Sequence, residues 1–186
     1  WRFLYKNRLE GLHWEVLEQE CGEELLRLTG ALYMGPPDGE LVSGASRSAK
    51  EHGLAHTLHT HAEVQKNWPQ FQLPDSFQGL YEDRAGYLLS ERAVEAYVNG
   101  ARQYGADLRG DQLVTDWRAT DAGVRVRVGP DEYVAEHLVI TAGAWAGKLL
   151  GSVNVPLRVT RQVIGWVAPA QPDQFTADRF PVWVID

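Results

Sequence analysis

Apolar residues recur along this chain with two different periods, which predict a mixture of helices and strands. Residues 2–20 place apolar side chains three or four positions apart, a spacing that forms one stripe along a helix. Gly22 then provides a stop signal. The same reasoning predicts helices at 40–52, 61–67, 91–104 and 145–150, and Ser90 is expected to cap the third of these.

Strands are predicted where the period falls to two. The run Val124-Arg125-Val126-Arg127-Val128 alternates strictly, as expected for a strand with one wet face. With the runs at 113–117 and 133–140 it predicts a β-meander. The other predicted strands are 25–34 with a break at Gly30, 77–82, 86–89, 107–108, 156–167 and 181–186. The expected fold class is α/β, or α+β within these residues, with a second, mixed sheet interleaved along the chain.

The stretch from Tyr133 to Leu150 suggests a binding function. Its apolar residues Leu138–Ile140 predict a strand that stops at Thr141-Ala142-Gly143-Ala144, where a helix pattern begins at once. Small side chains at a strand end let a ligand approach the main chain closely. The N–H groups at a helix start have no partners within the helix, so they can bind an anionic group. This arrangement predicts a dinucleotide contact, although the 186 residues contain no G-x-G-x-x-G.

The composition narrows the function classes. A net charge of −7 argues against a nucleic-acid-binding protein, which normally has a basic face. No apolar run approaches the roughly 20 residues of a membrane helix, and the opening WRFLYKNRLE does not resemble a secretory leader. The single cysteine, Cys21, cannot form an internal disulfide. We therefore expect a cytoplasmic protein, and the missing initiator Met indicates a piece of a longer one.

Three histidines lie close together at His56, His59 and His61, with Glu63 nearby, which is a pattern that could bind a metal ion. On a strand, however, His59 and His61 share one face while His56 points to the other. No cysteine completes the set. We therefore expect a solvated segment without a physiological metal, and adventitious binding of zinc or nickel stays open.

Two further groups of charged residues are weighed in the same way. Glu82, Asp83 and Arg84 adjoin a predicted turn, where a solvated surface is favoured over a carboxylate pair for acid–base catalysis. Arg158 and Arg161 lie three positions apart on a predicted strand, so they point to opposite faces. One guanidinium could bind a substrate carboxylate, but a structural salt bridge is favoured.

An ordered set of segments resembles a known family of flavoproteins. Each segment is ordinary by itself, but together they cover nearly the whole chain in colinear order. The segments are LTGALYMGP at 28–36, AKEHGL at 49–54, NWP at 67–69, ERAVEAY at 91–97, GA at 105–106, LVITAGAW at 138–145 and RQVIG at 161–165. The chain resembles the central part of the monomeric sarcosine oxidase and N-methyltryptophan oxidase family, within the D-amino-acid-oxidase-like FAD-dependent oxidoreductases.

The resemblance implies a two-domain oxidase in which a substrate domain covers FAD. Residues 1–24 and 84–152 would belong to the Rossmann-like FAD-binding domain, and residues 25–83 and 153–186 to the substrate domain. Such enzymes take a hydride from a secondary amine or N-methyl amino acid, and the reduced flavin then converts O2 to hydrogen peroxide.

The resemblance also implies roles for particular residues. Val114 matches a position whose backbone meets the adenine end of FAD. Val184 matches a position on the substrate side of the flavin. The residues that match the turn lying along the cofactor are Thr141, Ala142, Gly143 and Trp145.

Several parts of the family pattern do not occur in these residues. The glycine-rich strand–helix unit and the arginine-rich loop after it are absent, and the family's later cysteine and lysine would follow Asp186. Cys21 does not match the flavin-attachment position. We therefore expect the catalytic residues outside this chain, with weak or no FAD binding and no activity for these 186 residues alone.

The substrate, the covalent or non-covalent state of the flavin, the electron acceptor and the oligomeric state stay open. Two alternative functions also stay open. One is a non-catalytic α/β module whose 141–144 turn packs against a neighbouring backbone. The other is a different flavoprotein of the same superfamily, such as a glycine oxidase or a dehydrogenase.

Overall fold

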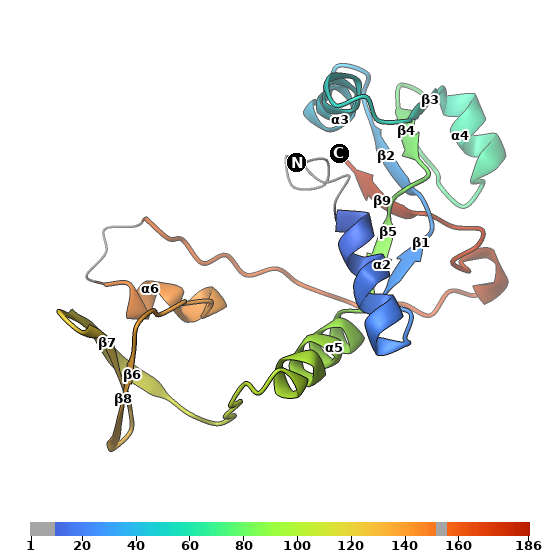
Figure 1. Cartoon of the computed structure of the whole chain (residues 1–186). Helices are drawn as coiled ribbons and strands as arrows, with labels where there is room; N and C mark the ends of the chain where they lie inside the picture. The colour runs from blue at the N-terminus through green and yellow to red at the C-terminus, as the bar shows by residue number, and fades with distance from the viewer. Residues whose placement is uncertain (1–9, 152–155) are drawn as a thin grey trace. The chain divides into compact units, whose positions relative to one another are not determined.

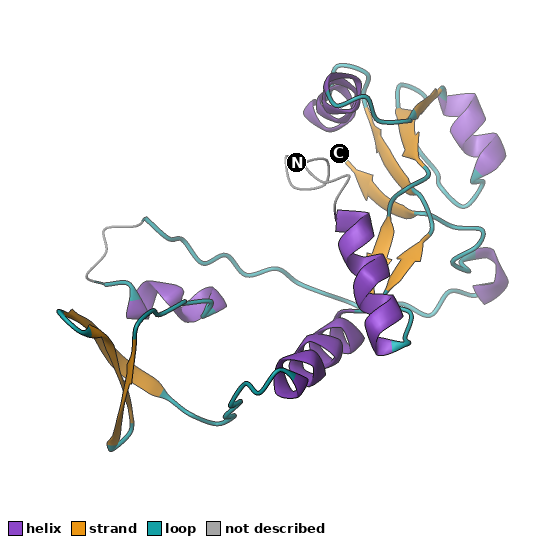
Figure 2. Ribbon diagram, in the orientation of Figure 1, coloured by secondary structure: helices purple, strands orange, loops and turns teal. Residues whose placement is uncertain are grey.

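The computed structural model describes residues 10–151 and 156–186, which fall into two compact units (Figures 1 and 2). One unit comprises residues 1–106 and 167–186, and the other comprises residues 107–166. The helices are α2 (Glu10–Cys21), α3 (Glu40–Glu51), α4 (His61–Asn67), α5 (Ser90–Gln103), η1 (Gly143–Trp145), α6 (Ala146–Leu149) and η2 (Pro172–Gln174). The strands are β1 (Leu26–Leu28), β2 (Ala31–Gly35), β3 (Thr57–His59), β4 (Gln78–Glu82), β5 (Gly86–Leu88), β6 (Val114–Thr120), β7 (Gly123–Val128), β8 (Asp131–Ala135) and β9 (Val182–Ile185).

The first unit is built on a mixed sheet, which confirms one part of the predicted fold class. The strand order is β3-β4-β2-β9, in which β2 pairs antiparallel with β4 and parallel with β9. The parallel pair places Ala31 beside Val182 and Met34 beside Ile185. Strand β9 therefore joins a strand that lies about 150 positions earlier in the sequence, as the register shows.

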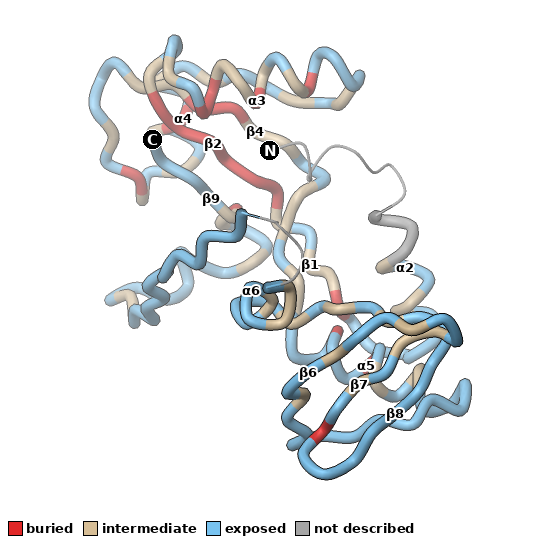
Figure 3. Tube along the Cα trace, turned by 90° about the vertical axis from the view of Figure 1, so that its left-hand side faces the viewer, coloured by how far each residue is buried: buried red, intermediate tan, exposed pale blue. Residues whose placement is uncertain are grey.

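Strand β2 is buried along its whole length (Figure 3). On one face, Ala31 and Tyr33 pack with Leu41, Val42 and Ala45 of α3. The other face has a separate set of contacts, in which Leu32 and Met34 pack with Val64 of α4 and with Phe71. A strand covered on both faces reads as a continuous apolar run, which explains why the sequence ALYM shows no alternation.

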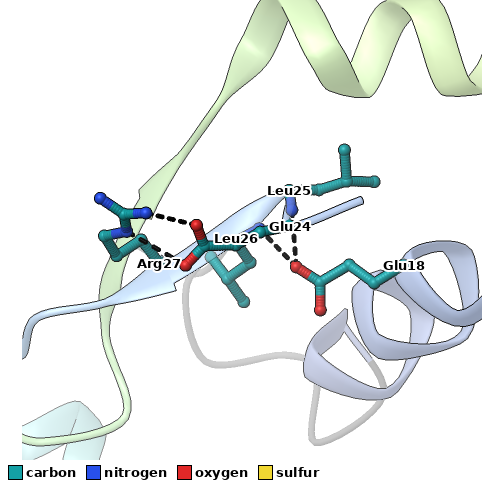
Figure 4. A network of polar contacts seen from close by, with 5 residues as sticks. All are labelled: Glu18, Glu24, Leu25, Leu26 and Arg27. Atoms are coloured by element: carbon teal, nitrogen blue, oxygen red, sulfur yellow. Dashed lines mark hydrogen bonds and ion pairs between the residues drawn. The ribbon is translucent and has the colours of Figure 1, made fainter. Parts of the chain in front are cut away.

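The same unit contains a small sheet of β1 and β5 and the helices α2 and α5. Glu18 at the end of α2 accepts hydrogen bonds from the backbone N–H groups of Leu25 at 2.6 Å and Leu26 at 2.9 Å (Figure 4). Trp14 of α2 meets Tyr97 of α5 edge-on, with ring centroids 6.0 Å apart. Residues 2–9 of the predicted first helix lie outside the described residues.

The second unit contains the predicted β-meander. Strands β6, β7 and β8 pair antiparallel in sequence order. The valines of β7 lie on the less exposed face, where Val128 is buried, while Arg125 on the other face donates to Glu132 at 2.7 Å. Trp117 of β6 donates its indole N–H to the carbonyl of Leu149 at 2.6 Å, which fixes α6 against the meander.

Three strand predictions are wrong. Residues 138–140 are not a strand, because β8 ends at Ala135, and residues 107–108 and 156–167 are also irregular. A strand needs a partner for its N–H and C=O groups. The described residues place no strand beside these three segments, so their β propensity has no effect.

One local prediction is wrong. The N-cap of α5 is Leu89, not Ser90, whose hydroxyl instead donates to Glu91 at 3.0 Å. The predicted strands on either side of the 83–85 turn are confirmed as β4 and β5, which lie in different sheets, since β4 belongs to the four-stranded sheet and β5 pairs with β1. Within the described ranges, no helix is long and apolar enough to cross a bilayer.

Candidate functional site

The 141–145 turn follows the meander in the second unit. Ala142 is the N-cap of the 3-10 helix η1, and its carbonyl accepts a hydrogen bond from the N–H of Trp145 at 2.9 Å. Gly143 has a φ of +51°, in the left-handed region that glycine adopts most readily. Both helical segments here are short: η1, within the turn, has 3 residues, and α6, directly after it, has 4.

The main chain of this turn is open. A Cβ placed on Gly143 would meet no heavy atom within 4 Å, Thr141 is exposed, and the Trp145 side chain is 66% exposed. No large side chain among the described residues therefore fills the space beside Gly143. A planar ligand can approach bare backbone here.

The backbone of this turn differs from the sequence prediction of a strand end followed by a helix with free N–H groups. The chain before Thr141 is irregular, and the N–H of Trp145 is already bonded within the turn. The turn therefore offers an open main chain, but it is not a long helix N-terminus for a pyrophosphate.

Val114, the other predicted cofactor residue of this unit, begins β6 and is half-buried. A β-bulge between Val114 and Asp116 interrupts the register with β7. Further along the same strand, Trp117 bonds to the end of α6. The strand that starts at Val114 is thus tied to the helix that continues the 141–145 turn.

Val184 lies in the other unit, on β9 opposite Tyr33 of β2, and is 41% exposed. Its place on the substrate side of the flavin stays a prediction, as do the cofactor contacts of Val114 and of the turn residues.

The structure shows a charged cluster that sequence reasoning missed. The guanidinium of Arg109 donates to Asp107 from both Nε (2.9 Å) and Nη2 (2.6 Å), and to the hydroxyl of Tyr133 at 2.6 Å. It also lies over the ring of Tyr133, 5.2 Å from the centroid. The hydrogen bond from Arg109 lowers the pKa of Asp107, and the same contact raises the pKa of Arg109.

This cluster ties the loop before β6 to strand β8. The Asp-x-Arg spacing is visible in the sequence, but its tyrosine partner is 24 residues away. Only the meander register brings the two together, so no local pattern could have found the contact.

The three histidines have different partners. His56 Nδ1 lies 2.9 Å from the carbonyl of Leu54, the His59 ring meets Trp68 edge-on at 5.4 Å, and His61 Nε2 lies 3.6 Å from Asp75. Among residues 10–151 and 156–186, no group of three or more His, Cys, Asp or Glu side chains is placed to hold a metal ion.

Glu63 has a local structural role. Its carboxylate accepts hydrogen bonds from the backbone N–H of Thr60 at 2.7 Å and from the Thr60 hydroxyl at 3.0 Å. The Thr60 hydroxyl accepts the N–H of Glu63 in return, which makes a capping box at the start of α4. The backbone hydrogen bond from Thr60 is the main reason that the pKa of Glu63 is lowered.

The remaining candidate residues are exposed. Asp83 and Arg84 lie in an exposed turn, as the sequence predicts. Arg158 and Arg161 are exposed in an irregular segment and form no ion pair within the described part of the chain, so the favoured salt bridge is not seen. Cys21 is free and exposed at the end of α2.

Comparison with protein families gives one match over almost the entire chain. The family described as "FAD dependent oxidoreductase" (DAO) matches residues 4–186. The chain is 33% identical over 172 residues to monomeric sarcosine oxidase from Streptomyces avermitilis, covering 92% of this chain and 45% of the relative. It is 28% identical over 173 residues to N-methyl-L-tryptophan oxidase from Yersinia pestis, covering 93% and 46%. The chain thus spans about half the length of the curated relatives it matches.

Solved structures agree on the fold. NikD, an unusual amino acid oxidase essential for nikkomycin biosynthesis, superposes with a TM-score of 0.68 at 22% identity, covering 75% of this chain and 37% of that one. Glycine oxidase from Geobacillus kaustophilus superposes with a TM-score of 0.66 at 22% identity, covering 81% and 41%. At this level of identity the superpositions support the fold and leave the substrate open.

Proposed function

The chain belongs to the FAD dependent oxidoreductase (DAO) family, and from this premise we propose that it is part of an oxidase acting on a secondary amine or N-methyl amino acid. The observation that carries the proposal is the colinear similarity to monomeric sarcosine oxidase, 33% identical over 92% of the chain. The parent protein is expected to use FAD, O2 and a small amine as its partners. A cytoplasmic location stays a prediction.

The open 141–145 turn is compatible with a flavin nucleotide. In this proposal the main chain from Thr141 to Gly143 lies along the cofactor, because no Cβ at Gly143 and no neighbouring side chain blocks the approach. Val114 would contribute backbone contact at the adenine end, and the exposed Trp145 would pack beside the nucleotide. When bound, FAD supplies the acceptor for a hydride from the amine and passes the electrons to O2, which yields hydrogen peroxide.

The residues of this chain are proposed to bind and orient, while the catalytic groups come from outside it. The 141–145 turn offers main-chain atoms, a hydroxyl and an indole, none of which is a general acid or base at neutral pH. Residues 1–24 and 84–152 are assigned to the FAD-binding domain, and 25–83 and 153–186, with Val184, to the substrate domain. These 186 residues alone are therefore expected to bind FAD weakly or not at all and to be inactive.

A paired assay tests the proposal. The full-length protein that contains this chain is purified beside the 186-residue chain, and both are assayed for peroxide with sarcosine, N-methyltryptophan and pipecolate. We expect peroxide from the full-length protein with at least one of these amines and none from the shorter chain. Visible flavin absorbance that co-purifies with the shorter chain would contradict the binding proposal, and no peroxide from the full-length protein with any of the three amines would contradict the proposed substrate class.

A further inference from the structure

A hollow of about 420 Å³ lies on the first unit, between one flank of α3 and strands β3 and β4. We call it the α3 hollow. Three of its lining residues, Ser43, Ser46 and Gln78, are half-buried, while Arg47 and Lys50 are exposed at the rim. Leu58 of β3 forms an apolar part of the wall and is 46% exposed.

The helix spacing explains why these polar side chains gather in one place. Ser43, Ser46, Arg47 and Lys50 follow the i, i+3, i+4, i+7 pattern, which aligns them along one flank of a helix. The neighbouring face carries Val42, Ala45 and Ala49, which are buried. The polar flank therefore runs along the border between the helix and its sheet.

The five polar side chains of the α3 hollow have no side-chain partners among the described residues. Arg47 and Lys50 form no ion pair, and Ser43, Ser46 and Gln78 form no side-chain hydrogen bond with any other residue that the structure describes. Glu51 lies four positions after Arg47, a spacing that favours pairing on a helix, yet it is not within ion-pair distance. Arg47 and Lys50 therefore leave two positive charges without an ion-pair partner at the rim of the hollow.

We propose that the α3 hollow is a binding site for a small oxyanion, a carboxylate or phosphate group on an organic molecule. Arg47 and Lys50 supply charge-assisted donors, since Arg binds carboxylate and phosphate through its planar fork and Lys acts as a point charge. The hydroxyls of Ser43 and Ser46 and the amide of Gln78 can donate to the remaining oxygens. An apolar part of the ligand would contact Leu58. The site is independent of the proposed flavin function, because it uses none of its residues.

Titration of the 186-residue chain by NMR tests the site, with inorganic phosphate and hexanoate as probes at constant ionic strength set with sodium chloride. We expect saturable shifts of amide signals that are confined to α3, β3 and β4. Tighter binding of hexanoate assigns the site to organic carboxylates, and tighter binding of phosphate assigns it to phosphate esters. Shifts that stay linear for both probes, or that spread over the unit, overturn the proposal.

Substitutions provide the matched controls. Arg47→Gln and Lys50→Gln should each weaken binding about tenfold, the loss expected for one charge-assisted hydrogen bond. Arg102→Gln removes an exposed cation from the last turn of α5, outside the hollow, and should change nothing. Glu51→Gln removes a negative charge at the end of α3 that repels an anionic ligand, so it should tighten binding, a gain that a destabilised variant cannot mimic. Equal affinities for Arg47→Gln and Arg102→Gln, or no gain from Glu51→Gln, would refute the site.

Discussion

Replacing Gly143 by Asn in the full-length protein tests whether a flavin lies against the 141–145 turn. The φ of +51° at Gly143 disfavours most residues, but Asn visits the left-handed region more readily than other side chains. A Cβ at this position meets no heavy atom within 4 Å, so the Cβ of the new side chain clashes with none of the described residues. Its bulk instead enters the space that the proposed cofactor would occupy.

Gly129 offers a matched control in the same unit. Its φ is +56°, and a Cβ on it also meets no heavy atom within 4 Å. Gly143→Asn and Gly129→Asn should therefore cost the same stability, at most about 1 kcal/mol each from the left-handed backbone. Only Gly143→Asn should raise the dissociation constant for FAD, by about tenfold or more, which corresponds to about 1.4 kcal/mol.

The assay compares the two variants with the unsubstituted protein. The flavin-to-protein ratio after purification gives the occupancy, and titration of flavin-free protein with FAD gives the affinity. Thermal unfolding without flavin checks that both variants lose the same stability. If Gly143→Asn keeps the FAD occupancy of Gly129→Asn, the cofactor does not approach the turn, and the assignment of Thr141, Ala142, Gly143 and Trp145 fails.

Four further predictions test the fold by urea unfolding, and the last of them also by hydrogen exchange. Leu80→Ala should lower the unfolding free energy by about 2 to 5 kcal/mol because the side chain is fully buried. Leu28→Ala, at a position 56% exposed, should change it little, and similar losses for both variants would contradict the placement of the core. Thr60→Ala should cost about 1 kcal/mol through loss of the cap, and an unchanged midpoint would argue against the capping box. Glu63→Gln should destabilise the chain at neutral pH. Because the folded-state pKa of Glu63 is lowered, its carboxylate stabilises the fold above the unfolded pKa, and this stabilisation is lost as the pH falls through the folded pKa. A difference in unfolding free energy between the two proteins that does not change with pH would refute a role for the carboxylate charge. Trp117→Phe should cost about 1 kcal/mol by removing the hydrogen bond to the end of α6, and equal protection of α6 amides from hydrogen exchange in both proteins would count against that contact.

Much of the secondary structure follows from the sequence because its determinants are local. The helices α3 and α4 lie within a residue or so of their predicted ranges, and α4 spans His61–Asn67 as expected. A helix forms its hydrogen bonds within its own segment, so spacing and stop signals are enough to locate it. The meander is predictable for a related reason, since its strands are consecutive and joined by short turns.

The candidate site was only partly predictable. The sequence identifies the small residues of the 141–145 turn, and the family match over residues 4–186 agrees with the resemblance of the ordered segments. Whether that turn is open depends on which side chains pack around it, and only the structure shows free space beside Gly143. The contact of Arg109 with Tyr133 was also invisible, because the meander register sets it.

Local pattern is enough to locate helices α3 and α4, the meander and the family resemblance. Long-range pairing sets which apolar runs are strands: Val182–Ile185 is a strand because it pairs with β2, while Leu138–Ile140 is not, since no described strand lies beside it. The physical reason is that a strand's backbone groups need a partner from elsewhere in the chain, and side-chain pattern does not specify where that partner lies.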